Sequence, residues 1–265
     1  MRICSLSSGS KGNATFVASE KSKILVDAGH SGRTIELLLK SIGEDARDLD
    51  AIFVTHEHGD HIKGVGVLSR RYDLPIVANE KTWLAMQAKI GPIDSKNIFV
   101  FKTNTFFHYR DMDVHAISTF HDAADPVAFV FYQNQHKISI LTDTGIVTEA
   151  IKSAVHGSDA IILESNHDVD MLQTGPYPYR LKERILSDHG HLSNGMAQDM
   201  LADILLGKNE NIILGHLSDE NNLEDLAYNG VFSRLTNLGL KVNKDIHLQV
   251  APKLSKGQMI DLNKK

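Results

Sequence analysis

The segment Thr55-His56-Glu57-His58-Gly59-Asp60-His61 places four potential metal ligands within six residues, directly after an apolar run that ends at Val54. These side chains cannot all face one point on a helix, but a loop between a strand and a helix can wrap them around a metal pair. Gly59 permits the tight backbone path that such a loop needs. Imidazole and carboxylate groups together suit zinc, iron or manganese. The segment therefore predicts a metal site at the end of a strand.

Apolar runs elsewhere in the chain end in side chains of the same chemical kinds. The runs and the residues that follow them are Ile24–Val26 with Asp27, Ile138–Leu141 with Asp143, Ala160–Leu163 with Glu164, and Asn211–Leu214 with His216. Their length and composition are typical of buried strands. In α/β folds, ligands gather outside the carboxyl ends of the strands. Five strand ends, counting the one before His56, therefore predict one assembled site.

Helical patterns alternate with these strands. Apolar residues from Thr34 to Ile42 share one helical face that closes at Gly43, and a second face runs from Met196 to Leu205. For the second helix we expect Ser193 or Asn194 as the N-cap and Gly207 as the end. We find no Pro-rich linker, low-complexity tract or short repeat. The pattern predicts an α/β fold in a single domain, residues 1–265.

Cysteine usage and hydropathy bear on where the protein works. Cys4 is the only cysteine, which rules out an intramolecular disulfide and thiolate-only zinc sites and favours a reducing compartment. No apolar run approaches the ~20 residues that cross a bilayer. The first residues turn to serine and glycine too early for a signal peptide. The sequence therefore predicts a cytoplasmic protein without a membrane partner.

The charge balance constrains the kind of partner. The net charge is -5, which argues mildly against a broad surface that grips nucleic acid through phosphate attraction alone. A local basic groove remains open, and bound metals would add positive charge. The 14 histidines are unusual, and six have no other candidate ligand around them: His30, His108, His115, His136, His156 and His247. We interpret these six as ordinary surface or core residues.

The segment His56-x-His58-x-Asp60-His61 resembles the signature of the metallo-β-lactamase superfamily. Further motifs match in chain order: Leu-Val-Asp27-Ala-Gly, Thr-Phe-His121-Asp, Leu-Thr-Asp143-Thr-Gly and Leu-Gly-His216-Leu-Ser. The resemblance covers the chain from about Ile3 to Val250. It implies a four-layer αββα sandwich, in which two mixed sheets are flanked by helices and the metals lie at one edge between the sheets.

The same resemblance implies roles for individual residues. One metal would be held by His56, His58 and His121, the other by Asp60, His61 and His216, with Asp143 bridging the two. Such paired ions, here zinc, manganese or iron, lie ~3.5–4 Å apart and share a hydroxide that acts as the nucleophile. Asp60 would also orient that hydroxide. Asp27 would hold the histidine loop through hydrogen bonds without touching a metal.

Two ligand positions narrow the chemistry within the superfamily. A histidine at position 58 speaks against the oxygen-reducing di-iron branch, which usually has a carboxylate there. Asp143 stands where many true β-lactamases present a cysteine. A bridging carboxylate favours a symmetric two-metal clamp suited to phosphodiester displacement. Thioester and lactone hydrolases share these ligands, so they remain alternatives.

A second pair of residues is similar to the glutamate and histidine of the tRNA-maturing endonucleases in the superfamily. Glu164 ends a strand, and His191 in His189-Gly190-His191-Leu-Ser precedes a predicted helix. A helix N-terminus attracts phosphate, and a carboxylate on one imidazole nitrogen fixes the tautomer of a general acid. We therefore expect His191 to protonate the leaving oxygen and Glu164 to orient it. The alternative is a loop histidine beside a capped surface acid, and the role of His189 stays open.

Four longer motifs resemble the bacterial YycJ/WalJ (VicX) family over essentially the full chain: Ser7–Asn13, Glu164–Asp168, Tyr177–Arg184 and Gly190–Asn194. Its members are described as metal-dependent 5′→3′ DNA exonucleases, associated with cell-wall two-component loci of Gram-positive bacteria. The resemblance implies a DNA substrate. The substrate contacts that we expect from these motifs are Ser8, Ser10, Asn13, Asn166, His167, Arg184, Ser193 and Asn194.

Several interpretations remain open at this point. The Ser/Gly-rich segment Ser7–Asn13 is either a turn between strands or a phosphate-binding loop. Pro176–Arg184 places aromatic beside basic residues, as a single-strand contact would, or is a loop leading into a solvated helix. Arg70, Arg71 and Lys81 compete as a basic patch. The alternative functions are a small-molecule phosphodiester, thioester or lactone hydrolase and a regulatory partner of a two-component system, and the oligomeric state is not indicated.

Overall fold

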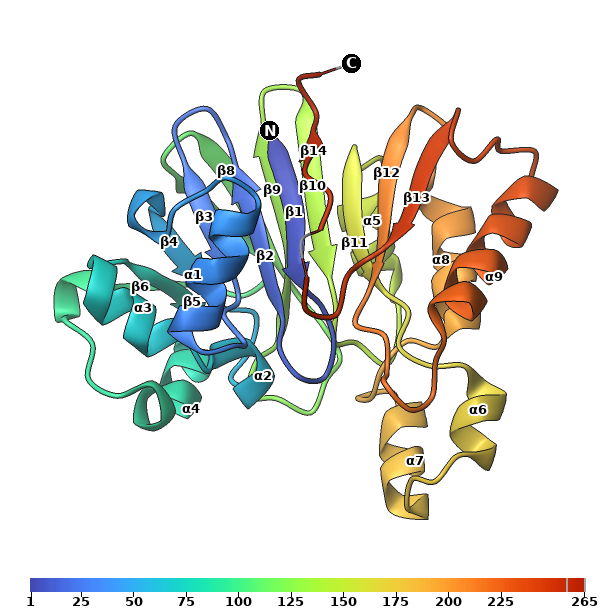
Figure 1. Ribbon diagram of the computed structural model, residues 1–265, viewed down its shortest axis with the longest axis horizontal. Helices are drawn as coiled ribbons and strands as arrows, with labels where there is room; N and C mark the ends of the chain where they lie inside the picture. Colours follow the sequence, from blue (N-terminus) through green and yellow to red (C-terminus); the bar gives the residue numbers. More distant parts are fainter. Residues whose placement is uncertain (256, 265) are drawn as a thin grey trace.

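Two seven-stranded sheets form the body of the protein, and helices cover their outer faces (Figure 1). The computed structural model describes residues 1–255 and 257–264. The strand order is β14-β1-β2-β3-β4-β5-β6 in the first sheet and β13-β12-β11-β10-β9-β8-β7 in the second. Each sheet contains both antiparallel and parallel neighbours. The predicted four-layer αββα sandwich is therefore confirmed.

The first half of the chain builds the first sheet and its helices. Its strands are β1 (Arg2–Ser7), β2 (Ala14–Ala18), β3 (Lys23–Val26), β4 (Ala51–Phe53), β5 (Ile76–Asn79), β6 (Ile98–Phe101) and the late strand β14 (Ile260–Asp261). Its helices are α1 (Gly32–Ser41), α2 (Gly59–Ile62), α3 (Val65–Tyr72) and α4 (Glu80–Ile90), with 3₁₀ turns η1 (Ala46–Asp48) and η2 (Ser95–Asn97).

The second half builds the second sheet. Its strands are β7 (Thr105–Tyr109), β8 (Met112–Ser118), β9 (Val127–Gln133), β10 (His136–Leu141), β11 (Ala160–Glu164), β12 (Glu210–Gly215) and β13 (Ile246–Val250). Its helices are α5 (Glu149–Val155), α6 (Val169–Thr174), α7 (Tyr179–Leu186), α8 (Asn194–Ile204) and α9 (Glu224–Asn237). In Figure 1 the pair α6–α7 extends beyond the body at the lower right.

Side chains alternate between two apolar layers along each central strand. In β4, Phe53 packs between the sheets, whereas Ile52 packs under the helices of the first sheet. In β11, Ile162 points into the same inter-sheet core and Ile161 packs under the helices of the second sheet. Strands buried on both faces have continuous apolar sequences, which is why these runs were recognisable. Phe53 is fully buried, and its ring contacts four other aromatic rings.

The parallel strands bring the predicted site residues to one edge. Strands β3 and β4 run parallel, as do β10, β11 and β12. The carboxyl ends of parallel strands lie at the same edge of a sheet, so the loops after them converge. A hydrogen bond from Val127 N to Thr55 O (3.1 Å) ties the two sheets together at this edge.

Helix boundaries differ slightly from the predicted ones. Helix α8 begins at Asn194, with Ser193 as the N-cap, and ends at Ile204 before reaching Gly207. It ends early because the buried carboxylate of Glu210 accepts hydrogen bonds from the backbone of Leu206 and Lys208 and draws the chain into a turn. In the described part of the chain, no helix has the length and apolar character needed to cross a membrane.

Replacing Phe53 by alanine removes the ring at the centre of the inter-sheet core. We expect Phe53→Ala to lower the free energy of unfolding by about 3–5 kcal/mol, because it leaves a cavity among neighbours that cannot collapse. Leu84→Ala is the control, because Leu84 is 62% exposed and its loss costs about 0.5 kcal/mol or less. Urea unfolding measures both, and equal midpoints would contradict the assignment of this core.

Candidate metal centre

The loop after β4 is held in place by one buried carboxylate. Asp27 accepts hydrogen bonds from Thr55 N (2.9 Å) and Thr55 Oγ1 (2.8 Å) and lies 2.7 Å from His61 Nδ1. Thr55 Oγ1 in turn lies 3.0 Å from His56 Nδ1. Because Thr55 donates its proton to Asp27, it can accept one from His56. Asp27 therefore orients both imidazoles, one directly and one through Thr55.

The structure brings the seven residues predicted to bind metal together. Their side chains form overlapping groups in which the candidate ligand atoms lie within 4.8 Å of one another: His56, His58 and His121; Asp60, His61 and His216; and His56, His61 and Asp143. The first two groups are the two triads expected from the sequence. The third includes Asp143 with one histidine from each triad, which is the position of a bridging carboxylate.

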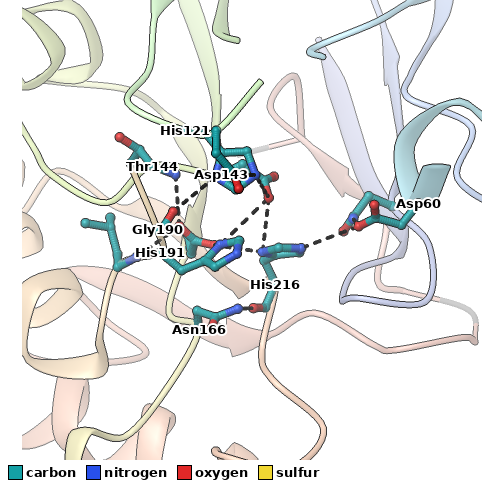
Figure 2. Close-up of polar contacts among 12 residues, drawn as sticks. Asp60, His121, Asp143, Thr144, Asn166, Gly190, His191 and His216 are labelled. Carbon is teal, nitrogen blue, oxygen red and sulfur yellow. Dashed lines mark hydrogen bonds and ion pairs between the residues drawn. The ribbon is translucent and has the colours of Figure 1, made fainter. Parts of the chain in front are cut away.

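Two of these residues leave their strands through an unusual backbone conformation. Asp143 follows β10 with φ 58°, and His216 follows β12 with φ 56°. Left-handed backbone at residues other than glycine costs about 1–3 kcal/mol and persists where the surroundings require it. Figure 2 shows the result: His121, His191 and His216 lie around Asp143, and Asp60 faces His216 from the opposite side. The strained turns aim both side chains at the centre.

The buried candidate ligand histidines form hydrogen bonds through Nδ1, the ring nitrogen that points away from the centre of the site. His121 Nδ1 donates to Gly190 O (3.1 Å), and His216 Nδ1 donates to Glu164 Oε1 (2.7 Å). Among the described residues, His56 Nε2, His216 Nε2 and Asp143 Oδ2 are buried without a hydrogen-bond partner. Buried polar atoms rarely lack a partner, and outer hydrogen bonds on Nδ1 are the usual support for a histidine that binds metal through its other nitrogen. These residues therefore fit divalent metal ions.

The electrostatics of the site agree with that fit. Burial holds the pKa of His56 well below its usual value. Burial alone would raise the pKa of Asp143, but His216, His61 and His56 outweigh it and lower that pKa strongly. His216 shows the opposite balance, because Asp143, Asp60 and Glu164 overcome its burial and raise its pKa to about 10. Carboxylates that stabilise a proton on His216 also stabilise a cation, so metal binding there releases a proton.

Glu164 connects three loops of the site. It is completely buried, and its Oε1 lies 2.7 Å from the Nδ1 atoms of both His191 and His216. Its Oε2 accepts from Thr144 N (3.2 Å) and Leu192 N (3.1 Å). Burial would raise the pKa of Glu164, but His191 and His216 lower it to about 2. The sequence predicted the contact with His191, and the structure adds the contact with His216.

His191 lies at the more exposed edge of the site, and it forms a fourth group of neighbouring candidate ligand atoms with Asp143, Glu164 and His216. Its ring centroid is 4.9 Å from that of His121 and 5.1 Å from that of His216. Its side chain is 17% exposed, whereas the side chains of His121 and His216 are almost completely buried. Nδ1 is bound to Glu164, and the other ring nitrogen has no hydrogen-bond partner among the described residues, so it can meet a substrate. This geometry suits a group that donates a proton.

Several residues expected to touch substrate instead bind other parts of the protein. Ser8 Oγ accepts from His216 N (2.7 Å), and Asn166 Nδ2 donates to His216 O (2.8 Å; Figure 2). Asn13 Nδ2 lies 3.2 Å from Asp60 Oδ2 and 3.0 Å from His61 Nε2. These contacts fix the backbone and side chains of the candidate ligands. Substrate contact by Ser8, Asn13 and Asn166 stays a prediction.

The remaining predicted contacts are spread around the site. Ser193 caps α8, and Asn194 bonds to Ser165 Oγ and Asn222 within the buried interior. His167 is buried, its ring nitrogens have no partner among the described residues, and burial lowers its pKa to about 4. The last two, Ser10 and Arg184, are exposed, as is His189. Whether Ser10, Arg184 and the other residues of this set bind substrate stays a prediction.

The sequence interpretation missed three supporting residues. Thr55 forms hydrogen bonds with both Asp27 and His56 and so links these two residues. Glu57 Oε1 accepts a hydrogen bond from Ala124 N (2.9 Å), which joins the loop of His121 to the histidine loop. Asp122 Oδ1 lies 3.4 Å from His121 Nε2. All three lie beside predicted ligands in the chain, so adjacency was a signal. The contacts of Thr55 with Asp27 and of Glu57 with Ala124 join segments that are distant in sequence.

One well-formed cavity lies away from this site. A hollow of about 720 Å³ lies near the starts of β11, β12 and β13, where Asp159, Asn211 and His247 line it. Those strand starts are at the opposite end of the sheet from Glu164 and His216. The convergence of ligand atoms identifies the candidate centre better than cavity size does, because side chains that bind a metal lie close together and leave little open volume.

Residues 8–216 match the metallo-β-lactamase superfamily. The chain belongs to this superfamily. Exodeoxyribonuclease YycJ of Bacillus anthracis is 44% identical over 244 residues, which are 91% of this chain and 92% of that protein. Exodeoxyribonuclease WalJ of Streptococcus pneumoniae is 42% identical over 242 residues, covering 91% of this chain and 90% of that protein. The predicted resemblance to YycJ/WalJ proteins is confirmed.

Solved structures share this fold. The metallo-β-lactamase fold protein YhfI of Bacillus subtilis superposes with a TM-score of 0.71 at 15% identity, covering 98% of each chain. Human tRNase Z, short form, superposes with a TM-score of 0.62 at 20% identity, covering 83% of this chain and 93% of that one. At these identities the similarity establishes the architecture of the superfamily and nothing finer.

Asp27→Asn tests the support of the histidine loop. Asparagine tolerates the φ of 60° at this position, but its amide nitrogen cannot accept the hydrogen bonds that Asp27 receives. We expect the affinity for Zn²⁺ to fall about 10-fold to 100-fold, measured by competition with a chromophoric chelator. Asp113→Asn is the matched control, because Asp113 pairs with the exposed His108 (2.9 Å). Equal affinities in the two variants would contradict this role of Asp27.

Proposed function

We propose that the protein is a divalent-metal-dependent phosphodiesterase that removes nucleotides from the 5′ end of DNA. The observation that carries the proposal is the pairing of His191 with Glu164 at the rim of the candidate metal centre. The names of the YycJ and WalJ relatives support the same activity. Residues 1–265 would act as one domain, in the cytoplasm, on a nucleic-acid substrate.

The proposed ligands divide between two metal ions. His56, His58 and His121 would hold one, Asp60, His61 and His216 the other, and Asp143 would bridge them. The overlap of the ligand groups at His56, His61 and Asp143 supports two adjacent ions over one. Zinc, manganese and iron all suit this mixture of imidazole and carboxylate. Their charge would offset the acidic balance of the chain at the point where a phosphate must bind.

The metals would supply Lewis-acid stabilisation of the phosphate and an attacking water of lowered pKa. The rest of the chemistry belongs to side chains of the chain itself. Asp60 is ionised, because His61 and His216 lower its pKa against the effect of burial, so it can accept a hydrogen bond from the attacking water. His191 donates a proton to the departing 3′ oxygen, and Glu164 holds its ring in the orientation that this requires.

The direct test is degradation of end-labelled DNA. The purified protein, loaded with Mn²⁺ or Zn²⁺, is incubated with single- and double-stranded DNA labelled at the 3′ end. We expect stepwise, metal-dependent loss from the 5′ end. His58→Ala should abolish it, because the substitution removes a proposed ligand. His108→Ala should not, because His108 is exposed and belongs to none of the ligand groups.

The other outcomes separate the alternatives. Intact DNA after incubation with a protein that contains two metals would exclude the nuclease and favour a small-molecule phosphodiester, thioester or lactone. Loss from the 3′ end or internal cleavage would keep the phosphodiesterase and reject the proposed polarity. A cellular phenotype that persists unchanged in His58→Ala would favour a regulatory role.

His191→Ala and Glu164→Gln separate proton donation from metal support. We expect His191→Ala to lower kcat about 10²-fold to 10⁴-fold with unchanged metal content, because only the proton donor is lost. We expect Glu164→Gln to lower kcat and also to weaken metal binding about 10-fold to 100-fold, because Glu164 supports His216 as well. Turnover of labelled DNA and metal content after dialysis measure the two effects. Metal loss in His191→Ala would make that residue a ligand.

A further inference from the structure

Helix α7 is tied directly to the loop that carries His191. The chain passes from Leu186, the end of α7, to His191 through a short turn, in which Gly190 N donates to Ser187 O (2.9 Å). His191 N also donates to Ile185 O (3.1 Å) in the last turn of the helix. A group that binds at the last turn of α7 therefore lies beside the proposed general acid.

Arg184 is the basic residue of that last turn, and Asp122 holds it in place. Arg184 Nε donates to Asp122 Oδ2 (2.5 Å), and the other carboxylate oxygen lies 3.4 Å from His121 Nε2. One carboxylate thus separates the guanidinium from the ligand group of His56, His58 and His121.

The geometry leaves the outer face of the guanidinium available. The Arg184 side chain is 51% exposed, and its Nη1 and Nη2 donate no hydrogen bond within the described part of the chain. A guanidinium fixed through Nε presents these two nitrogens as a fork, which matches two oxygens of a phosphate. A phosphate at the metal ligands would leave Arg184 facing the next phosphate along the strand, not the one that is cleaved.

The position of His191 identifies the phosphate that Arg184 would face. In the proposed reaction the water oxygen bonds to phosphorus and gives up a proton to solvent, the bond from phosphorus to the 3′ oxygen breaks, and that oxygen takes a proton from His191. The departing nucleotide leaves with a 3′ hydroxyl and keeps the phosphate at its own 5′ end. The 5′-terminal phosphate therefore lies on the side of His191, which is also the side of α7 and Arg184.

We propose that Arg184, positioned by Asp122, binds the 5′-terminal phosphate of the departing nucleotide and makes the enzyme select 5′-phosphorylated strands. This inference rests on the proposed function and adds the group that recognises the strand end. It also explains why a chain with a net charge of -5 carries an arginine–carboxylate pair beside a phosphate site: Asp122 orients the guanidinium and leaves its fork for the substrate.

The test compares two oligonucleotides of one sequence, one with a 5′ phosphate and one with a 5′ hydroxyl, both labelled at the 3′ end. The measured quantity is the ratio of their kcat/KM values for the metal-loaded, full-length protein. We expect the wild type to favour the phosphate about 10-fold to 100-fold, as for hydrogen bonds to a charged group. Arg184→Ala should bring the ratio close to one, mainly through KM, and Arg184→Lys should give an intermediate ratio.

Arg234→Ala is the matched control. Arg234 pairs with Asp199 (3.1 Å) on the outer helices and is exposed to a similar degree, at 45% of its side chain. It should keep the wild-type ratio and rates. A wild-type ratio of one, or an Arg184→Ala variant that keeps the preference or slows both substrates equally, would overturn the inference and leave the nuclease standing. Failure of the metal-loaded wild type to degrade either oligonucleotide would overturn both proposals.

Discussion

Two buried carboxylates, one in each sheet, hold the histidines of the site. Asp27 follows β3 and orients His56 and His61, and Glu164 ends β11 and orients His191 and His216. A buried carboxylate is stable only when its oxygens accept hydrogen bonds, so each requires the residues that it positions. The two sheets are therefore joined at this edge by polar networks as well as by the apolar core behind them.

The same arrangement explains why the fold tolerates local strain. Asp27, Asp143 and His216 all adopt left-handed backbone within two residues of the ends of their strands. Each of these turns is backed by the rigid inter-sheet core and by hydrogen bonds. At His216, for example, the backbone N donates to Ser8 Oγ and the backbone O accepts from Asn166 Nδ2. The inter-sheet core and the local hydrogen bonds together stabilise left-handed backbone conformations that an isolated loop would not adopt.

Much of this architecture was predictable because strands buried on both faces have continuous apolar sequences, and because their polar successors stand out. The strands before Asp27, His56, Asp143 and His216 were recognised this way, and the convergence of their ends followed from parallel topology. The dense segment His56–His61 also allowed the family to be recognised. Local sequence therefore indicated an α/β fold and most of the candidate ligands, and the family resemblance supplied the four layers and His121.

Contacts between distant segments were not predictable in the same way. Nothing in the sequence around Glu164 indicates that it also binds His216, because that pairing depends on the register of β11 beside β12. The contacts of Ser8 and Asn13 with candidate ligands likewise depend on how the first loop folds over the site. Polar residues in a motif can thus serve the protein interior, which sequence alone does not distinguish from contact with a substrate.

The place of α6 and α7 in the chain has a consequence for how such proteins diversify. Both helices lie between Glu164 and His191, and the hydrogen bond between those two residues closes this segment into a loop with a fixed base. Because the base is pinned inside the protein and the last turn of α7 is bonded to His191, the outer parts of the two helices can lengthen, shorten or change their surface without moving the reactive groups. Evolution, or a designer, could exchange this module to redirect the enzyme to other strand ends while keeping the same chemistry.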